Sequence, residues 1–253
     1  MCRPHPCLEG RPHGRGCCQR PGWGRGPQPG IRRWQGLTAY INLEQVNFRW
    51  PQGGQVLSEI NLSIEKNQTI ALMGANGSGK TTLSKLILGL LKPTGGRVLL
   101  AGRPVESYSL AARGRLLGYV FQNPERQFFA PDVAEEIGFA LKYRNLSPEK
   151  IQERVAEMLA LFELEQYAAT FPFNLSQGEK QRLALAAILA PRPDFIIMDE
   201  PFLGLDWLRK QRLQAILERV RNEGVGYLLI SHDQALCARL CSQTLTLEGG
   251  RLL

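Results

Sequence analysis

A glycine-rich stretch followed by a lysine and two threonines carries the clearest chemistry in this sequence. It runs Gly74-Ala75-Asn76-Gly77-Ser78-Gly79-Lys80-Thr81-Thr82. Glycine lets the backbone curl until several N–H groups face one anion, and Lys80 would reach the β- and γ-phosphates of a nucleotide. The Thr81 hydroxyl is the expected ligand of a Mg²⁺ ion. The pattern G-x-x-x-x-G-K-[ST] fits at every fixed position, which predicts a phosphate-binding P-loop.

Two carboxylates at the end of an apolar run form a second candidate segment, Phe195-Ile-Ile-Met-Asp199-Glu200. Neighbouring side chains in a strand point to opposite sides, so the two acids need not share a role. Asp199 is expected to hold the Mg²⁺ ion, and Glu200 to polarise an attacking water molecule as a general base. Taken alone, Asp-Glu after a strand could be a solvated strand end. Together with the P-loop, the pair predicts nucleotide hydrolysis.

The elements that must position these residues alternate between strand and helix periodicity. Apolar alternation predicts strands over 41–50 and 55–64, and short apolar runs predict strands over 68–73, 195–198 and 227–230. Helical spacing predicts helices over 81–91, 132–143, 148–163, 176–189, 207–221 and 234–240. Strands that alternate with helices indicate an α/β domain, and the helices between about 130 and 190 read as an insert.

Positive charge is concentrated at the N-terminus. Of the formal net charge of +8, residues 1–36 contribute +6 through seven Arg and one Glu. A basic tail can bind phosphate backbones. However, a segment so rich in Gly, Pro, Arg and Cys cannot assemble a core, so we expect a disordered extension. Cys2, Cys7, Cys17 and Cys18 are irregularly spaced, which argues against a zinc site.

No segment of the sequence predicts a membrane-spanning helix. The longest purely apolar run, 183–190, is far shorter than the about 20 residues that such a helix needs. No apolar stretch follows the Arg-rich N-terminus, so it does not resemble a secretory signal. We therefore expect a cytosolic chain, with Cys237 and Cys241 as reduced thiols.

Between the two chemical segments lies Leu175-Ser-Gln-Gly-Glu-Lys-Gln-Arg182, which resembles the signature sequence of ABC ATPases. Other marks of that family follow in order. Gln122 occupies the Q-loop position, Leu203-Gly-Leu-Asp206 resembles the D-loop, and Ser231-His232-Asp233 resembles the switch histidine segment. Trp50 matches the aromatic residue that stacks on adenine. The resemblance covers residues 38–253.

The resemblance implies an α/β fold, a P-loop NTPase core of the ABC ATPase type with an N-terminal antiparallel β subdomain. A helical subdomain is expected over about 123–190. Glu200, His232 and Gln122 would be catalytic. Thr81, Gln122 and Asp199 would hold Mg²⁺. The residues expected to bind ATP are Trp50, Gly74, Ala75, Asn76, Gly77, Ser78, Gly79, Lys80, Thr81, Thr82, Ser176, Gln177, Gly178 and Asp206.

The same resemblance implies that hydrolysis needs two ATPase subunits. Ser176 and the backbone of Gly178 would contact the γ-phosphate of ATP held by another subunit, and Asp206 would lie at the interface. The pair would be a homodimer or a heterodimer with a paralogous subunit. The sequence departs from the family pattern at Gln177, where glycine is usual, and at Trp207, where proline is common.

One segment points to a subgroup. Phe121-Gln-Asn-Pro-Glu-Arg-Gln127 is similar to the Q-loop region of energy-coupling-factor ATPases, which drive uptake of vitamins or of metal ions such as cobalt and nickel. This implies transmembrane transporter subunits as partners and a peripheral position on the cytoplasmic face of the membrane. The alternative is a soluble ABC ATPase, such as an iron–sulfur assembly ATPase. No nucleic-acid partner is expected.

A docking surface for the membrane partner is expected over residues 122–139. Phe128, Phe129 and Phe139 would supply apolar anchors. The acidic residues expected to accept basic side chains of the partner are Glu125, Asp132, Glu135 and Glu136.

We predict that residues 1–36 are dispensable for ATP hydrolysis, because they lie outside every motif. A chain that lacks them should turn over ATP within about twofold of the full-length rate, as expected for a terminal extension without a core. Steady-state ATPase assays on both chains check this. A larger loss, or the release of stoichiometric zinc from the full-length chain, would contradict it.

Overall fold

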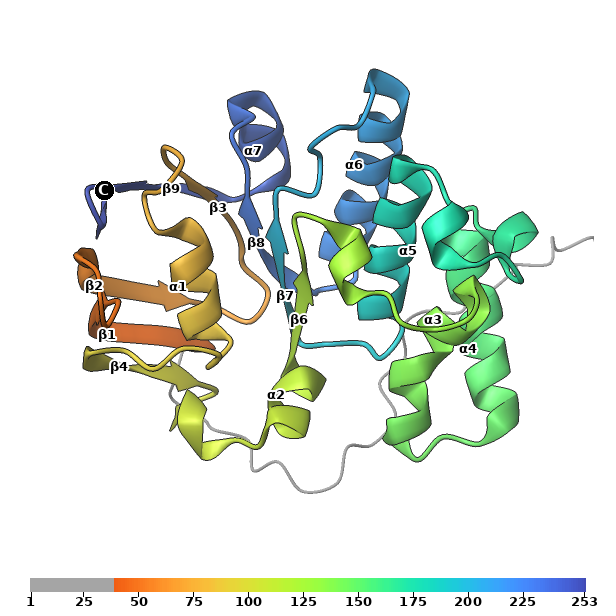
Figure 1. The fold of residues 1–253 in the computed structure, drawn as a ribbon, viewed down its shortest axis with the longest axis horizontal. Coiled ribbons are helices and arrows are strands. Elements are labelled where there is room, and N and C mark those ends of the chain that lie inside the picture. The colour runs from red at the N-terminus through yellow and green to blue at the C-terminus, as the bar shows by residue number, and fades with distance from the viewer. Residues whose placement is uncertain (1–38) are drawn as a thin grey trace, which may run out of the picture. The chain divides into compact units, whose positions relative to one another are not determined.

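The structure, a computed structural model, describes residues 39–253, so the predicted disordered extension lies outside the described residues. Within this range the chain forms two β-sheets with helices packed around them (Figure 1). One sheet has four strands in the order β2-β1-β4-β5, and the other has six in the order β10-β9-β3-β8-β7-β6. The α/β architecture is therefore confirmed.

The four-stranded sheet is the expected antiparallel subdomain. Its strands are β1 (Ile41–Arg49), β2 (Gln55–Ile64), β4 (Gly95–Leu100) and β5 (Arg103–Pro104). β1 pairs antiparallel with both β2 and β4. Its buried and less buried positions alternate for most of its length, because one face of the sheet packs on the core and the other faces solvent.

The six-stranded sheet carries the predicted chemical segments. Its strands are β3 (Thr69–Met73), β6 (Leu117–Val120), β7 (Phe195–Asp199), β8 (Gly226–Ile230), β9 (Gln243–Glu248) and β10 (Arg251–Leu252). β8 lies between β3 and β7 and is parallel to both. All residues of β7 and β8 are buried, as expected for a parallel sheet that is covered on both faces.

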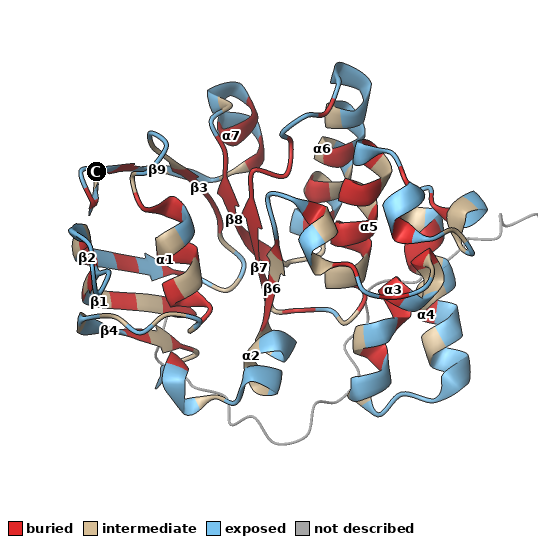
Figure 2. Cartoon of the chain, viewed as in Figure 1, coloured by how far each residue is buried: buried red, intermediate tan, exposed pale blue. Residues whose placement is uncertain are grey.

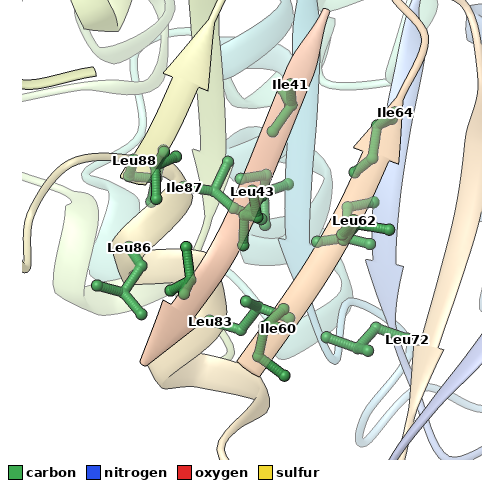
Figure 3. Packing of buried hydrophobic residues seen from close by; sticks show 14 of the residues in the cluster. Ile41, Leu43, Ile60, Leu62, Ile64, Leu72, Leu83, Leu86, Ile87 and Leu88 are labelled. Carbon is green, nitrogen blue, oxygen red and sulfur yellow. The ribbon is translucent and has the colours of Figure 1, made fainter. Parts of the chain in front are cut away.

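The core lies between the antiparallel sheet and α1 (Lys80–Ile87). Apolar residues of the parallel strands β3, β7 and β8 belong to the same core. Leu83, Leu86 and Ile87 of α1 face Leu43 of β1 and Ile60 of β2 (Figure 3). Figure 2 shows the burial concentrated in the parallel strands and in the inward faces of the helices. This packing fixes the helix that begins at the P-loop lysine.

The remaining helices are α2 (Leu110–Leu116), α3 (Val133–Phe139), α4 (Pro148–Leu161), α5 (Gln177–Leu189), α6 (Trp207–Asn222) and α7 (Gln234–Leu240). α3 packs against both α4 and α5, which forms the helical part expected between the P-loop and the second acidic strand. No helix within residues 39–253 is long and apolar enough to span a membrane.

Two predicted helices end four residues earlier in the structure, at Ile87 and at Phe139. The first ends at Ile87 instead of residue 91 because Gly89 adopts a left-handed φ of 67°. The amides of Gly89 and Leu90 then donate to Leu86 O and Lys85 O, which closes the helix as a Schellman motif. The second, predicted over 132–143, divides into α3 and a 3₁₀ segment (Ala140–Arg144) that stops at Asn145 with φ 54°.

Candidate active site

A cavity of about 390 Å³ opens at the carboxyl ends of β3, β7 and β8. It brings together most of the residues predicted to act on ATP, from five separate parts of the chain. Its lining residues are Trp50, Val56, Asn76, Gly77, Gly79, Lys80, Thr81, Thr82, Gln122, Asp199, Glu200, Leu203 and His232.

The glycines of the P-loop are required by its backbone. Gly74 has φ 148°, and a Cβ there would lie 2.3 Å from the carbonyl oxygen of Leu247. Gly79, at the start of α1, has φ 107°, and a Cβ there would lie 2.9 Å from Leu57. Any other residue would strain the turn that aims the α1 amides into the cavity.

Lys80 and Ser78 give the loop unsatisfied capacity for a phosphate. The buried Lys80 Nζ donates to the carbonyl oxygens of Gly74 at 2.8 Å and of Ala75 at 3.0 Å. An ammonium has three N–H donors, so one of them can still donate to a ligand. Among the described residues, the buried Ser78 hydroxyl has no hydrogen-bond partner. These polar atoms fit a polyanionic ligand, because buried polar groups are normally paired.

Thr81 and Asp199 meet although they lie far apart in the sequence. Thr81 Oγ1 donates to Asp199 Oδ2 at 2.9 Å, and the hydroxyl of Tyr119 donates to the same oxygen at 3.3 Å. Burial, with Asp199 nearby, raises the pKa of Tyr119 to about 12, so its hydroxyl keeps its proton. Hydroxyl, carboxylate and amide oxygens from Thr81, Asp199 and Gln122 are the hard ligands that Mg²⁺ takes. The residues present therefore fit the ion.

Glu200 stands beside the switch histidine. Its backbone adopts a left-handed φ of 51°, and its amide donates to Ile230 O at 2.9 Å. His232 Nε2 lies 3.0 Å from Glu200 Oε1, yet without hydrogen-bond geometry, so this buried oxygen lacks a hydrogen-bond partner among the described residues. Burial raises the pKa of Glu200, and the charge of His232 opposes that shift.

Trp50 lies at the mouth of the cavity, where an adenine ring could stack. Its side chain is 41% exposed, and its ring packs edge-on against Phe48 at a centroid distance of 5.0 Å. Since Phe48 is buried in the antiparallel sheet, its contact fixes the orientation of the Trp50 ring at the cavity mouth.

The signature residues Ser176, Gln177 and Gly178, and Asp206 of the D-loop, do not line this cavity. Ser176 precedes α5, and its amide donates to Glu179 Oε2 at 2.7 Å. Gly178 lines a different cavity, and Asp206 caps α6 by accepting from the Arg209 amide at 2.8 Å. Gln177 is exposed in the first turn of α5. A single chain therefore does not join these predicted ATP contacts to its own P-loop.

Three residues at or near the site were not among the predicted site residues. Tyr119 contacts Asp199, while Val56 and Leu203 line the cavity. Tyr119 lies on β6, which pairs with β7, the strand that ends at Asp199. This neighbour relation is known only from the strand order, so the sequence alone could not identify Tyr119. Val56 carries no chemical signal in the sequence, and the only signal at Leu203 is its place as the first residue of the segment that resembles the D-loop.

The relatives found by comparison with known proteins are described as ATP-binding proteins of transporters. A provisionally named ABC transporter ATP-binding protein of Pyrococcus horikoshii is 41% identical, with 84% of this chain and 81% of the relative covered. The energy-coupling factor transporter ATP-binding protein EcfA of Methanocaldococcus jannaschii is 34% identical, with 84% and 77% covered. A Caldanaerobacter subterraneus relative is 39% identical, but this chain spans only 37% of its length.

Two solved structures of ATP-binding cassette proteins also resemble this chain. Clostridium perfringens cbiO1, described as part of the ABC transporter complex cbiONQ, matches with TM-score 0.78 and 29% identity, over 85% of this chain and 87% of that one. An ATP-binding cassette solved as a dimer after hydrolysis, with ADP and phosphate, matches with TM-score 0.76 and 26% identity, over 84% and 96%. The ABC transporter family profile matches residues 57–203. This chain belongs to the ATP-binding subunits of the ABC transporter family, and it is an ATPase of that family.

Proposed function

We propose that this chain powers a membrane importer of the energy-coupling-factor type, for a metal ion or a vitamin. The hydrolytic part rests on one observation: Lys80, Thr81, Asp199, Glu200 and His232 line a single cavity. The transport part is supported by the EcfA relative and by the cbiO1 structure. The position that follows is peripheral, on the cytoplasmic face of the membrane.

The proposed reaction uses each residue according to its place. Lys80 and the P-loop amides bind and orient the β- and γ-phosphates. Thr81 and Asp199, with Gln122, would hold Mg²⁺, which supplies charge neutralisation at the phosphate oxygens. Glu200 accepts the proton of the attacking water, and its Oε1, which has no hydrogen-bond partner among residues 39–253, is the atom available for that proton. His232, adjacent to this oxygen, orients the base and the γ-phosphate.

We infer that two such subunits act together. Ser176, Gly178 and Asp206 lie outside the P-loop cavity, as expected if they serve a nucleotide on another subunit. The exposed Trp207 and Leu208 directly follow Asp206, so an apolar surface borders these residues. A homodimer and a heterodimer with a paralogous ATPase both satisfy this arrangement, and the dimeric cassette structure supports it.

The surface proposed for the membrane subunit is aromatic. Three aromatic side chains are exposed here: Phe129 (60%), Phe139 (38%) and Tyr143 (65%). The ring of Phe139 packs edge to face against Phe129 at a centroid distance of 4.3 Å and against Tyr143 at 5.4 Å. Phe128, by contrast, is buried. Exposed aromatic rings in contact with one another mark an interaction surface.

The expected acidic cluster in this segment is not a free surface. Glu136 is buried, and its Oε2 accepts from the amides of Phe129 at 3.0 Å and Ala130 at 2.8 Å. Asp132 caps α3, Glu135 pairs with Lys142, and Glu125 pairs with Lys180. These carboxylates hold the segment in shape, which leaves the aromatic rings as its contact surface.

The pH dependence of ATP hydrolysis should reveal the environment of Glu200. A general base works only when ionised, so a raised pKa moves the acid limb of the rate above the ordinary glutamate value of 4.5. In the His232→Gln chain the limb should move further upward, because the positive charge that lowers this pKa is gone. Turnover measured from acid to neutral pH checks this. An acid limb that stays in place or moves down in His232→Gln contradicts it.

Glu200→Gln should bind ATP but hydrolyse it about 10²–10⁴-fold more slowly, because the general base is lost. The variant should also accumulate as a long-lived ATP-bound dimer, which sedimentation with Mg-ATP detects. Glu218→Gln, a change at a carboxylate on α6 outside the cavity, is the matched control and should behave as the unmodified chain. Near-normal turnover in Glu200→Gln would exclude this residue as the base.

Phe129→Ser should reduce assembly with the transmembrane subunit by about tenfold, as for a buried aromatic anchor at an interface. ATP turnover of the isolated chain should not change, because Phe129 does not line the cavity. The measurement is the yield of polytopic membrane protein that copurifies from detergent-solubilised membranes. Leu110→Ser, at a leucine on α2 that is 67% exposed, is the control. Equal yields from the two variants would remove the aromatic surface as the contact.

A further inference from the structure

A second cavity, of about 250 Å³, lies between α5 and α6 and shares no lining residue with the ATP cavity. In Figure 1 these helices run side by side on the flank of the parallel sheet. Three arginines and two glutamates supply its charged groups. The lining residues are Glu163, Gln166, Tyr167, Gly178, Glu179, Gln181, Arg182, Leu205, Arg209, Arg212 and Leu213.

Gln181 supplies an unsatisfied donor to this cavity. Its side chain is 2% exposed, and its Nε2 has no hydrogen-bond partner among the described residues. A buried amide without a partner is uncommon in a folded protein and indicates a missing acceptor.

The arginines have donors to spare. Arg182 and Arg212 both donate to one carboxylate oxygen, Glu163 Oε2, at 3.1 and 2.9 Å. A guanidinium has five N–H donors, so a shared oxygen satisfies only a small part of this capacity. Arg209 adds a third guanidinium, which pairs with Asp206 at 3.1 Å.

Both carboxylates in the wall already accept hydrogen bonds. Glu163 Oε2 takes both guanidiniums, and Glu179 Oε2 accepts from the Ser176 amide at 2.7 Å. The Tyr167 hydroxyl also bonds to Glu179. The surplus in this cavity is therefore of hydrogen-bond donors, supplied by Gln181 and the guanidiniums.

We propose that this cavity binds a small oxyanion, a phosphate or a carboxylate, held by Gln181 Nε2 and the guanidiniums of Arg182 and Arg212. Charge-assisted pairing with guanidinium favours such planar or tetrahedral oxygen groups. The bound anion would tie the first two turns of α5 to the first two turns of α6. Gly178 and Asp206 stand at those turns, so occupancy would fix their relative position. The inference does not depend on the transport role.

The test uses the full chain with Lys80→Ala, which weakens phosphate binding in the ATP cavity. Inorganic phosphate and succinate are titrated separately by calorimetry, without nucleotide. We expect saturable binding of at least one, and the anion that binds identifies the ligand class. Adding Arg182→Gln with Arg212→Gln should weaken it by about tenfold or more. Arg219→Gln with Arg239→Gln, at two arginines that do not line the cavity, should leave it unchanged.

Gln181→Met separates ligand binding from folding. It keeps the volume of the side chain but removes the unpartnered donor, so stability without anion should hold or rise while anion affinity falls. A glutamine with only a structural role would lose stability on this change. Absence of saturable binding, or equal affinity in the Arg182/Arg212 and Arg219/Arg239 double variants, would overturn the proposal.

Discussion

Parallel hydrogen bonding of β8 with β3 on one side and β7 on the other is the constraint on which the candidate active site depends. Because the three strands run in one direction, their carboxyl ends open at the same edge of the sheet. The P-loop follows β3, Asp199 and Glu200 end β7, and Ser231-His232 follows β8. A slip of one residue in β7 would turn Asp199 to the other face and break its contact with Thr81.

The apolar strands and α1 hold charged side chains at this edge of the sheet, where their burial is energetically unfavourable. Leu83, Leu86 and Ile87 of α1 are fully buried, and burying a leucine side chain contributes about 1.5–3 kcal/mol. Lys80, Asp199 and Glu200 are also buried, and a buried charge is unfavourable unless it is paired. The core thus holds in place an incompletely paired set of charges, which a nucleotide and its metal ion would complete.

The helical part is held together by a buried arginine. Arg154 of α4 donates to Leu189 O and Ala190 O at 3.1 and 3.0 Å, which satisfies the last carbonyls of α5. It also pairs with Glu157. α4 and α5 are therefore coupled, so the aromatic surface beside α3 and the signature residues before α5 belong to one packed unit.

Local sequence was enough for much of this fold. The P-loop, the acidic strand and the switch segment were located, because glycine spacing and apolar runs that end in polar residues are local signals. The strands β1 and β2 and the helices α4, α5, α6 and α7 lie close to their predicted bounds. The elements that were not predicted are β4, β5, β6, β9, β10 and α2. β4 begins with two glycines, and β10 and β5 are only two residues long, so pairing with neighbouring strands defines them.

What only the tertiary structure decided are contacts between residues distant in the chain. The sequence by itself determined which side chains could do chemistry, since their types and spacing are local. The strand order decided that Tyr119 shares Asp199 with Thr81. Folding also decided that Glu136 is buried against two amides while Phe129 is exposed, although both looked like surface anchors. The physical reason is that burial and pairing depend on what packs opposite a residue, and no local pattern encodes that neighbour.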